Sequence, residues 1–349
     1  MRTLILSCNT GEGHNSCARA IRAVYAAHGV PCEITDTLQF VSDGFSRLVS
    51  RGHSGMYRRA PRLFDRGYGF LERHPAAGHS AESLFALGRE KLTDFLRQGG
   101  YDTVICTHPF AATMLRGTPA DVRRAFVATD YTCSPTVKDC GADFCFIPAE
   151  DLRADFRGGT LSDERIFASG IPVAPGFFSA VRSPQPQPHL VMMGGSMGCG
   201  PMETLLSRLS EDSSFDITVV CGSNAVLRDR LARRFPQSNI RVLGYVKDMA
   251  ELLSSADLYL TKPGGLSSTE AAVLRIPMVF INAVGGCEEY NLRYFCERGG
   301  ALAGRAAEDT AALCLSLLHE PALREEMAAA LRALAIPNGA EEIFQTLCG

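Results

Sequence analysis

The chain has 349 residues, 46% of them hydrophobic and 21% charged, with a formal net charge of −3 at pH 7. This length allows two domains with separate cores, and the composition is that of a folded globular protein. The slightly acidic balance excludes a general electrostatic attraction to nucleic acid. No apolar run approaches the roughly 18 residues that a membrane-spanning helix needs.

The 13 cysteines are odd in number and scattered, without a Cys-x-x-Cys pair. Most stand in apolar segments, as Cys106 and Cys221 do, which is typical of reduced, packed thiols in a cytoplasmic protein. Cys133, Cys140 and Cys145 lie close together in the sequence, but their spacing fits no zinc pattern. We therefore expect no metal site.

Apolar periodicity predicts that the chain opens with a strand, a glycine turn, a helix and a second strand ending at Asp36. This βαβ pattern indicates a parallel sheet. The expected ranges are 2–8, 9–14, 15–28 and 32–35. In the rest of the first half we expect a helix over 80–97 and strands over 102–107, 125–129 and 144–148.

The first glycine turn has several interpretations. Gly11-x-Gly13, with Asp36 further on, resembles half of a dinucleotide-binding fingerprint, although Ser16 stands where the third glycine is required. Alternatively, His14 lies at the carboxyl end of the first strand, where an imidazole can act as a general base or contact a phosphate. A purely structural interpretation has His14 helping to cap the helix.

Two other polar residues, His108 and Asp130, also come just after predicted strands. The carboxyl ends of parallel strands line the edge of an open sheet where ligands bind. We therefore expect His14, His108 and Asp130 to lie along one functional edge.

Residues 43–74 mix arginines with aromatic and aliphatic residues, and their seven arginines and three carboxylates give a local charge of +4. Basic residues interleaved with apolar ones suit a surface that lies on anionic lipid headgroups, and we assign this contact to residues 45–73. A solvated amphipathic pair of helices explains the same pattern equally well.

The second half of the chain follows stretches rich in proline and glycine at 170–176 and 183–188, which indicate a linker between domains. A strand over 189–193 then leads into a loop with four glycines in residues 194–200, before a helix over 202–209. Backbone N–H groups in such a loop suit a diphosphate, although a flexible turn is the plain alternative.

Residues 261–270 form the most informative stretch, because an apolar strand meets a Pro-Gly-Gly turn and then a helix over 269–274. Glycines let a ligand approach the backbone closely, and N–H groups at a helix start favour anions. Glu270 would lie about one turn into the helix, able to accept hydrogen bonds from ribose hydroxyls. In the plain alternative Ser267 or Ser268 caps the helix and Glu270 only complements its dipole.

Further elements complete the second half. The carboxylates and amide at 288–291 fall in a predicted loop, where they could hold sugar hydroxyls. We expect strands over 215–221, 240–246 and 277–281, and helices over 225–234, 248–255, 307–319, 321–334 and 338–348.

Short motifs occur in a specific order along nearly the whole chain: Gly11-x-Gly13-His14, His108-Pro109, Thr129-Asp130-Tyr131, Gly170-Ile171-Pro172, Lys262-Pro263-Gly264-Gly265 with Thr269-Glu270, and Gly286-x-Glu288-x-x-Asn291. With the two sets of βα units, they resemble the diacylglycerol glycosyltransferases. That group contains monogalactosyldiacylglycerol synthase and is related to the peptidoglycan N-acetylglucosaminyltransferase. The resemblance implies an α/β fold of the GT-B type, with two Rossmann-like parallel-sheet domains facing a central cleft.

The resemblance also implies a division of labour. Residues 1–170 would bind the lipid acceptor, residues 171–188 would be a hinge, and residues 189–335 would bind a UDP-sugar. Residues 336–349 would cross back to the N-terminal domain. We expect the protein to be cytoplasmic and peripheral on the inner face of the cell membrane.

The implied reaction is transfer of a hexose from a UDP-sugar to the hydroxyl of diacylglycerol or a related lipid, with inversion to a β-glycoside. His14 or Asp130 would accept the proton, with Gly13, His108 and Tyr131 on the acceptor side. Neither a cofactor nor a metal is implied, because backbone dipoles can stabilise the leaving UDP. The implied donor-side residues are Gly195, Ser196, Gly198, Gly264, Gly265, Ser267, Ser268, Glu270, Glu288, Glu289 and Asn291.

Two departures from the family pattern leave the substrates open. Residues 132–136 stand where the family often has a histidine and an aromatic residue, and Cys287 stands where glutamine is common. The alternatives are a GT-B enzyme with a soluble or cell-wall acceptor, a UDP-sugar epimerase, a dehydrogenase, and a non-catalytic nucleotide-sugar sensor.

Overall fold

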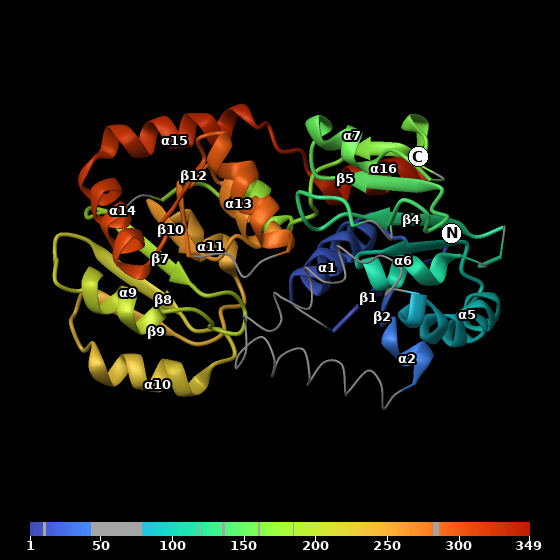
Figure 1. Cartoon of the computed structure of the whole chain (residues 1–349), viewed down its shortest axis with the longest axis horizontal. Helices are drawn as coiled ribbons and strands as arrows, with labels where there is room; N and C mark the ends of the chain where they lie inside the picture. The colour runs from blue at the N-terminus through green and yellow to red at the C-terminus, as the bar shows by residue number, and fades with distance from the viewer. Residues whose placement is uncertain are drawn as a thin grey trace. The chain divides into compact units, whose positions relative to one another are not determined.

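The computed structural model describes residues 1–9, 12–42, 79–116, 118–119, 121–134, 137–159, 161–183, 185–281 and 286–349. Within this part the chain folds as two compact units (Figure 1). The first comprises Met1–Pro175, Val284–Cys287 and Pro337–Gly349, and the second comprises Gly176–Ala283 and Glu288–Ile336. The basic stretch 45–73, for which we predict a membrane-surface contact, lies outside the described residues.

The first unit is built on a six-stranded parallel sheet in the order β2-β1-β3-β4-β5-β6. Its strands are β1 (Thr3–Ser7), β2 (Cys32–Asp36), β3 (Thr103–Cys106), β4 (Arg123–Val127), β5 (Phe144–Ile147) and β6 (Ile166–Ala168). Its helices are α1 (Glu12–Ala27), α2 (Leu38–Val41), α5 (His79–Gly99), α6 (Pro109–Leu115), α7 (Arg153–Phe156) and α16 (Gly339–Cys348).

Strand β1 shows why this sheet has two covered faces. All five of its residues are buried, and successive side chains point to opposite faces. Leu4 and Leu6 join a core that includes residues of α5 and α6. Ile5 joins a core formed with α1 and α16, in which Phe344 meets the ring of Tyr25 edge-on at 5.0 Å.

The second unit holds another six-stranded parallel sheet, in the order β12-β11-β10-β7-β8-β9. Its strands are β7 (His189–Met193), β8 (Asp216–Val220), β9 (Ile240–Leu243), β10 (Leu258–Thr261), β11 (Met278–Phe280) and β12 (Ala301–Ala303). Its helices are α8 (Gly176–Ser179), α9 (Met202–Leu209), α10 (Ala225–Arg234), α11 (Met249–Ser254), α12 (Gly265–Val273), α13 (Cys287–Glu297), α14 (Ala307–His319) and α15 (Pro321–Ala333).

Each sheet has one point where the strand order reverses. In the first unit the chain goes from β1 to the edge strand β2 and returns on the other side of β1 at β3. In the second unit it proceeds outward through β7, β8 and β9 and returns beside β7 at β10. The loops that leave the two central strands therefore run in opposite directions, and in this class of sheet ligands bind at the carboxyl ends of those strands.

The fold class predicted from the sequence is confirmed, whereas several element boundaries were wrong. Helix α1 begins at Glu12 rather than at residue 15, and α12 begins at Gly265 rather than at residue 269. Both helices absorb glycines that we had assigned to turns. Residues 287–297 form helix α13 instead of a loop, and the short elements β6, β12 and α6 were not predicted.

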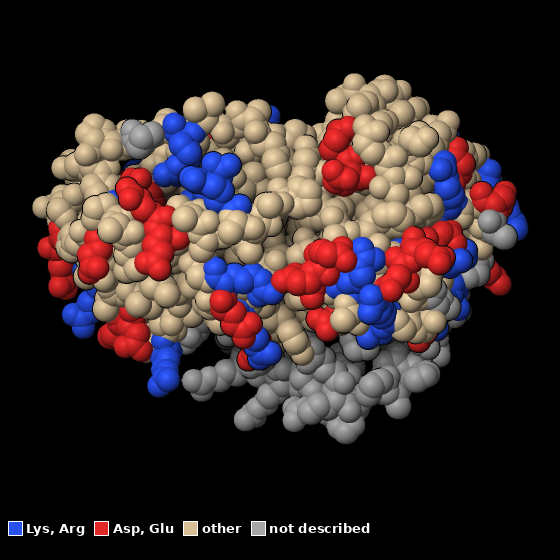
Figure 2. Space-filling model, turned by 90° about the horizontal axis from the view of Figure 1, so that it is seen from above, with Lys and Arg blue, Asp and Glu red and all other residues tan. Residues whose placement is uncertain are grey.

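Two further features concern the charges on the surface and the apolar character of the helices. Figure 2 shows lysine and arginine side chains interspersed with acidic ones on the face that it displays, which agrees with a net charge close to zero. Among the described residues, no helix combines the length and the apolar character that crossing a membrane requires.

Candidate functional site

His14 lies in the first turn of α1, at the point where the order of the first sheet reverses. Its Nδ1 atom is 2.8 Å from the carbonyl oxygen of Thr107 and 3.0 Å from the hydroxyl of Thr129. Because a carbonyl only accepts hydrogen bonds, Nδ1 must carry the proton of the neutral ring. The Nε2 atom then keeps its lone pair and can act as a base.

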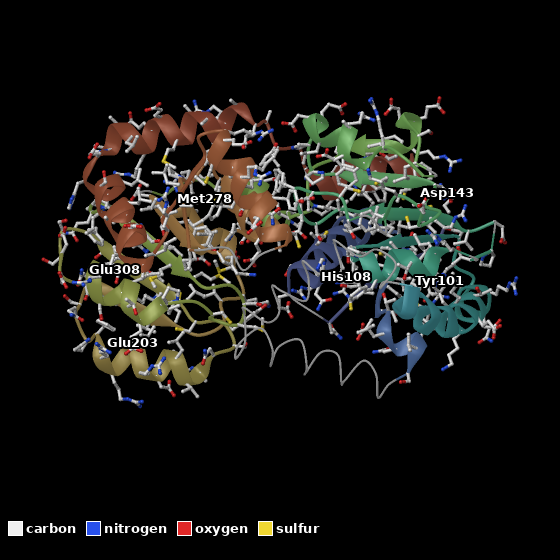
Figure 3. The ribbon with its side chains drawn as sticks, in the orientation of Figure 1. Tyr101, His108, Asp143, Glu203, Met278 and Glu308 are labelled. Atoms are coloured by element: carbon white, nitrogen blue, oxygen red, sulfur yellow. The ribbon has the colours of Figure 1, made fainter. Side chains whose placement is uncertain are left out.

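His108, which is labelled in Figure 3, follows β3 and caps α6. It contacts His14. Its Nδ1 atom accepts the N–H of Phe110 at 3.0 Å, and the two imidazole rings meet edge-on with their centroids 4.3 Å apart. His108 is 8% exposed. His108 is therefore buried beside the ring of His14. Its Nδ1 atom accepts a hydrogen bond, whereas the Nδ1 atom of His14 donates one.

The turn after β4 completes this edge. Thr129 and Tyr131 are buried, whereas Asp130 between them is half-buried. The structure thus brings His14 and His108 into contact and places Asp130 next to Thr129, the residue whose hydroxyl contacts His14. The contributions of Thr107 and Thr129 were missed, because a backbone carbonyl leaves no sequence signal and threonine is common in strands.

A chain of polar side chains holds the start of α1. Ser7 donates to Asn15 at 2.6 Å, Asn15 donates to Asn9 at 2.9 Å, and Asn9 donates to Asp36 at 3.0 Å. Asp36 also accepts the N–H of Leu38 at 3.2 Å and is 8% exposed. Asp36 is therefore engaged in support of the turn, which removes the ribose contact suggested by the dinucleotide-binding interpretation.

In the second unit the glycine loop after β7 lies at the corresponding reversal point. Gly195 has φ of +72°, and a Cβ atom there would come within 2.7 Å of the Lys262 side chain. Gly198 has φ of +58°, and its Cβ atom would lie 2.4 Å from the carbonyl oxygen of Cys221. The positive φ favours glycine at both positions, and at Gly198 the neighbouring backbone also leaves no space for a side chain.

The same loop has more free donors than free acceptors. The carbonyl of Ser196 accepts the N–H of Ser223 at 2.9 Å, and the carbonyl of Gly195 accepts the N–H of Gly198 at 3.0 Å. No acceptor among the described residues takes the N–H of Ser196 or Met197. Such a concave run of backbone N–H groups is suited to a phosphate.

Helix α12 begins beside this loop, directly after β10. Gly264 is its N-cap, with no side-chain capping bond, so both serine caps considered above were wrong. The Ser267 hydroxyl donates to the Gly264 carbonyl at 3.2 Å, and Ser268 is fully buried with no partner for its hydroxyl among the described residues. The N–H groups of residues 265–267 precede the first intrahelical bond, so they add donors to those of the glycine loop.

The turn before α12 is held by residues of α13. Lys262 pairs with Glu288 at 2.5 Å, and the Asn291 amide donates to the carbonyl of Pro263 at 3.0 Å. Asn291 is fully buried, whereas Glu289 is exposed. Of the predicted sugar ligands, Glu288 and Asn291 therefore position the turn, while Glu289 remains open to solvent.

Glu270 lies in the second turn of α12 and is half-buried. Among the described residues it has no hydrogen-bond or ion-pair partner, and burial raises its pKa to about 8. A carboxyl without a protein partner and with a strongly shifted pKa is a recurrent sign of a ligand site. In the described part of the chain, no group of three His, Cys, Asp or Glu residues could hold a metal ion.

Comparisons with known proteins agree with this geometry. Residues 14–173 match the family model of monogalactosyldiacylglycerol (MGDG) synthase, and residues 202–333 match that of glycosyl transferases group 1. The processive diacylglycerol beta-glucosyltransferases of Bacillus cereus (strain B4264) and Bacillus subtilis (strain 168) are 24% identical over 365 residues. These matches cover 99% of this chain and 93% and 94% of the two relatives.

Solved structures show the same fold. MurG of Acinetobacter baumannii superimposes with a TM-score of 0.64 at 17% identity, covering 99% of both chains. The spinosyn rhamnosyltransferase SpnG superimposes with a TM-score of 0.65 at 12% identity, covering 100% of both chains. The protein is therefore a glycosyltransferase of the GT-B class. It joins an MGDG synthase family domain to a group 1 glycosyltransferase domain and is a distant relative of the processive diacylglycerol beta-glucosyltransferases.

Proposed function

We propose that this glycosyltransferase moves a hexose from a UDP-sugar to the hydroxyl of diacylglycerol or a closely related lipid, with inversion at the anomeric carbon. The lipid acceptor is supported by the MGDG synthase family match, which spans the unit that carries His14. It is also supported by the names of the relatives that align with nearly the whole chain.

The observation that carries the mechanism is the hydrogen bond from His14 Nδ1 to the carbonyl of Thr107. It leaves Nε2 unprotonated, as a general base requires. In the proposed step, Nε2 takes the proton of the acceptor hydroxyl while the hydroxyl oxygen forms a bond to the anomeric carbon. The bond from that carbon to the β-phosphate oxygen breaks, and UDP leaves with the electron pair. Asp130 would support this base from the turn after Thr129.

The donor would bind at the reversal point of the second sheet. The backbone N–H groups of residues 195–197 and 265–267 would receive the diphosphate and the negative charge that develops on UDP. Lys262 lies between these two segments and could add a cation, while Glu289 would meet the sugar hydroxyls. Glu270 would accept hydrogen bonds from the ribose, which favour its ionised form and would lower its raised pKa.

The remaining expectations keep the same division of labour. The first unit would hold the acceptor and the second unit the donor. Residues 45–73 would rest on an anionic membrane surface, so that the enzyme works as a peripheral protein on the inner face of the cell membrane.

The test is incubation of the protein with anionic vesicles that contain diacylglycerol and with one UDP-sugar at a time, followed by mass spectrometry of the lipids. A hexosyl-diacylglycerol product is expected, and the tube that yields it names the donor. If UDP binds but no lipid product forms with any donor, the lipid acceptor is wrong and a soluble or cell-wall acceptor takes its place.

A further inference from the structure

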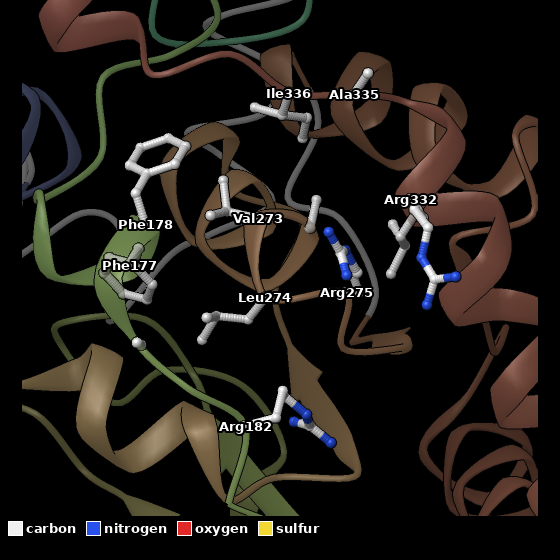
Figure 4. A pocket seen from close by; sticks show the side chains of 12 residues that line it. Phe177, Phe178, Arg182, Val273, Leu274, Arg275, Arg332, Ala335 and Ile336 are labelled. Carbon is white, nitrogen blue, oxygen red and sulfur yellow. The ribbon is translucent and has the colours of Figure 1, made fainter.

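The second unit contains a pocket of about 320 Å³ away from the reversal point of its sheet (Figure 4). It lies between α8, the C-terminal end of α12 and the C-terminal end of α15. Apolar walls come from Phe177, Phe178, Leu274 and Ile336. Its volume is within the range of pockets that hold small molecules.

Three arginines, Arg182, Arg275 and Arg332, line this pocket, and no acidic residue does. Arg182 is anchored, because it donates to the carbonyls of Leu253 and Ala256 and lies 3.5 Å from Asp257. Arg275 and Arg332 have no hydrogen-bond or ion-pair partner among the described residues. The partial negative charge at the C-terminal end of each of the helices α12 and α15 offsets about half of one positive charge. The pocket therefore retains a positive potential.

The backbone around the pocket is strained at two positions. Arg275 has φ of +58° and Ala335 has φ of +46°, and within the described residues these are the only non-glycine residues with positive φ. Arg275 ends α12 in a Schellman motif, where its N–H donates to Ala272 and the next N–H donates to Ala271. Glycine is the preferred residue at that position. An arginine in this strained conformation is an outlier for which a use of the side chain is a physical explanation.

We propose that this pocket binds an organic phosphate with a short apolar chain or ring. The guanidinium groups of Arg275 and Arg332 would hold the phosphate, because arginine matches phosphate geometry with paired hydrogen bonds. Phe178 and Leu274 would cover the apolar part of the ligand. The source of this chemistry is either a soluble phosphate monoester or the phosphodiester of a membrane lipid.

The pocket walls include the segments through which the chain enters and leaves the second unit. Residues 176–182 directly follow the passage at Pro175, and residues 331–336 directly precede the passage at Ile336. A ligand in this pocket would therefore contact both of these segments.

Binding is tested by calorimetry with hexyl phosphate on the full chain, in the presence of saturating UDP so that the proposed donor site is filled. Hexyl phosphate is expected to bind, and inorganic phosphate and hexanol are expected to bind at least tenfold more weakly. Dihexanoylphosphatidylglycerol, below its micelle concentration, presents the lipid phosphodiester. Whichever of the two probes binds more tightly identifies the source.

Arg275→Gly supplies the decisive variant, because it removes the cation and relieves the positive φ. Its Tm should equal or exceed that of the wild type, while hexyl phosphate affinity falls at least tenfold. Arg332→Gln should also weaken binding, and Arg233→Gln, on the exposed side of α10, serves as the matched control. Affinity within twofold of the wild type in both Arg275→Gly and Arg332→Gln would overturn the site, as would complete loss of binding when UDP is added. Neither result would bear on the proposed transfer reaction.

Discussion

Both sheet edges lie where the strand order reverses, but they present different chemical groups. At the reversal between β1 and β3, side chains dominate, and His14 contacts both His108 and Thr129. At the reversal between β7 and β10, the main chain dominates, with glycines that expose backbone N–H groups. A proton transfer needs a titratable side chain, whereas a diphosphate needs several fixed donors. Each edge is therefore suited to a different half of a transfer reaction.

His14→Ala, a change at the first edge, is expected to have the largest effect on turnover. Loss of a general base lowers kcat about 10²–10⁴-fold. Binding of UDP, measured by calorimetry, should not change. His28→Ala, a change to an exposed histidine just beyond the same helix, is the control and should leave kcat unchanged. If His14→Ala weakened UDP binding as strongly as it lowered turnover, the separation of the two edges would be wrong.

Glu270→Ala probes the other edge. Losing a carboxylate that accepts from the ribose removes a charge-assisted hydrogen bond, about 1.5–3 kcal/mol, so UDP affinity should fall about 10- to 150-fold. Calorimetry with UDP alone measures this loss without the lipid. Unchanged affinity would place the ribose elsewhere.

Lys262→Met tests how much of the diphosphate binding at the second edge depends on the main chain. It leaves Glu288, which is 9% exposed, without the partner that it has at 2.5 Å, so stability should fall by about 2 kcal/mol in urea unfolding. UDP affinity should fall less than in Glu270→Ala if backbone donors carry most of the diphosphate binding. Arg208→Gln, which removes an exposed ion pair with Glu211, is the control and should cost well under 1 kcal/mol.

Asn15→Ala breaks the polar chain that positions the start of α1. Its two hydrogen bonds, to Ser7 and Asn9, predict a loss of about 1–2 kcal/mol in stability. Because His14 is the preceding residue, kcat should fall several-fold while UDP affinity stays constant. A normal kcat in a destabilised Asn15→Ala protein would show that the network supports the fold alone.

Glu270 also predicts a dependence of stability on pH. Its folded pKa of about 8 lies above the ordinary value of 4.5 for a glutamate, so the folded protein retains a proton that the unfolded chain loses. Stability without ligand should therefore fall as pH rises from about 4.5 to about 8. Thermal unfolding of Glu270→Gln across this window should show a shallower fall than the wild type. Identical slopes would mean that burial does not raise this pKa.

Much of the fold could be predicted from the sequence, because strands such as β7 and helices such as α10 carry strong apolar periodicity and were predicted at their observed limits. The glycine turns were harder. Gly265 reads as a turn residue, yet it is the first residue of α12, since a helix start tolerates glycine when no side chain is needed as a cap.

The candidate sites were predictable where a titratable side chain follows a strand, as with His14 and His108. They were not predictable where backbone atoms or tertiary contacts act. Nothing in the sequence indicates that Asn291 holds the carbonyl of Pro263 or that Glu288 pairs with Lys262, because these contacts arise only when α13 packs beside the turn.

The packing of α16 has a consequence for how the protein is made. Ile343, Phe344 and Leu347 fill the core between α16 and the first sheet, although they follow the whole second unit in the sequence. On the ribosome, the first unit is begun early but cannot close this core until after the second unit has emerged. A nascent chain therefore exposes the α1 face of its first sheet throughout most of translation, and that surface is where a chaperone would bind it.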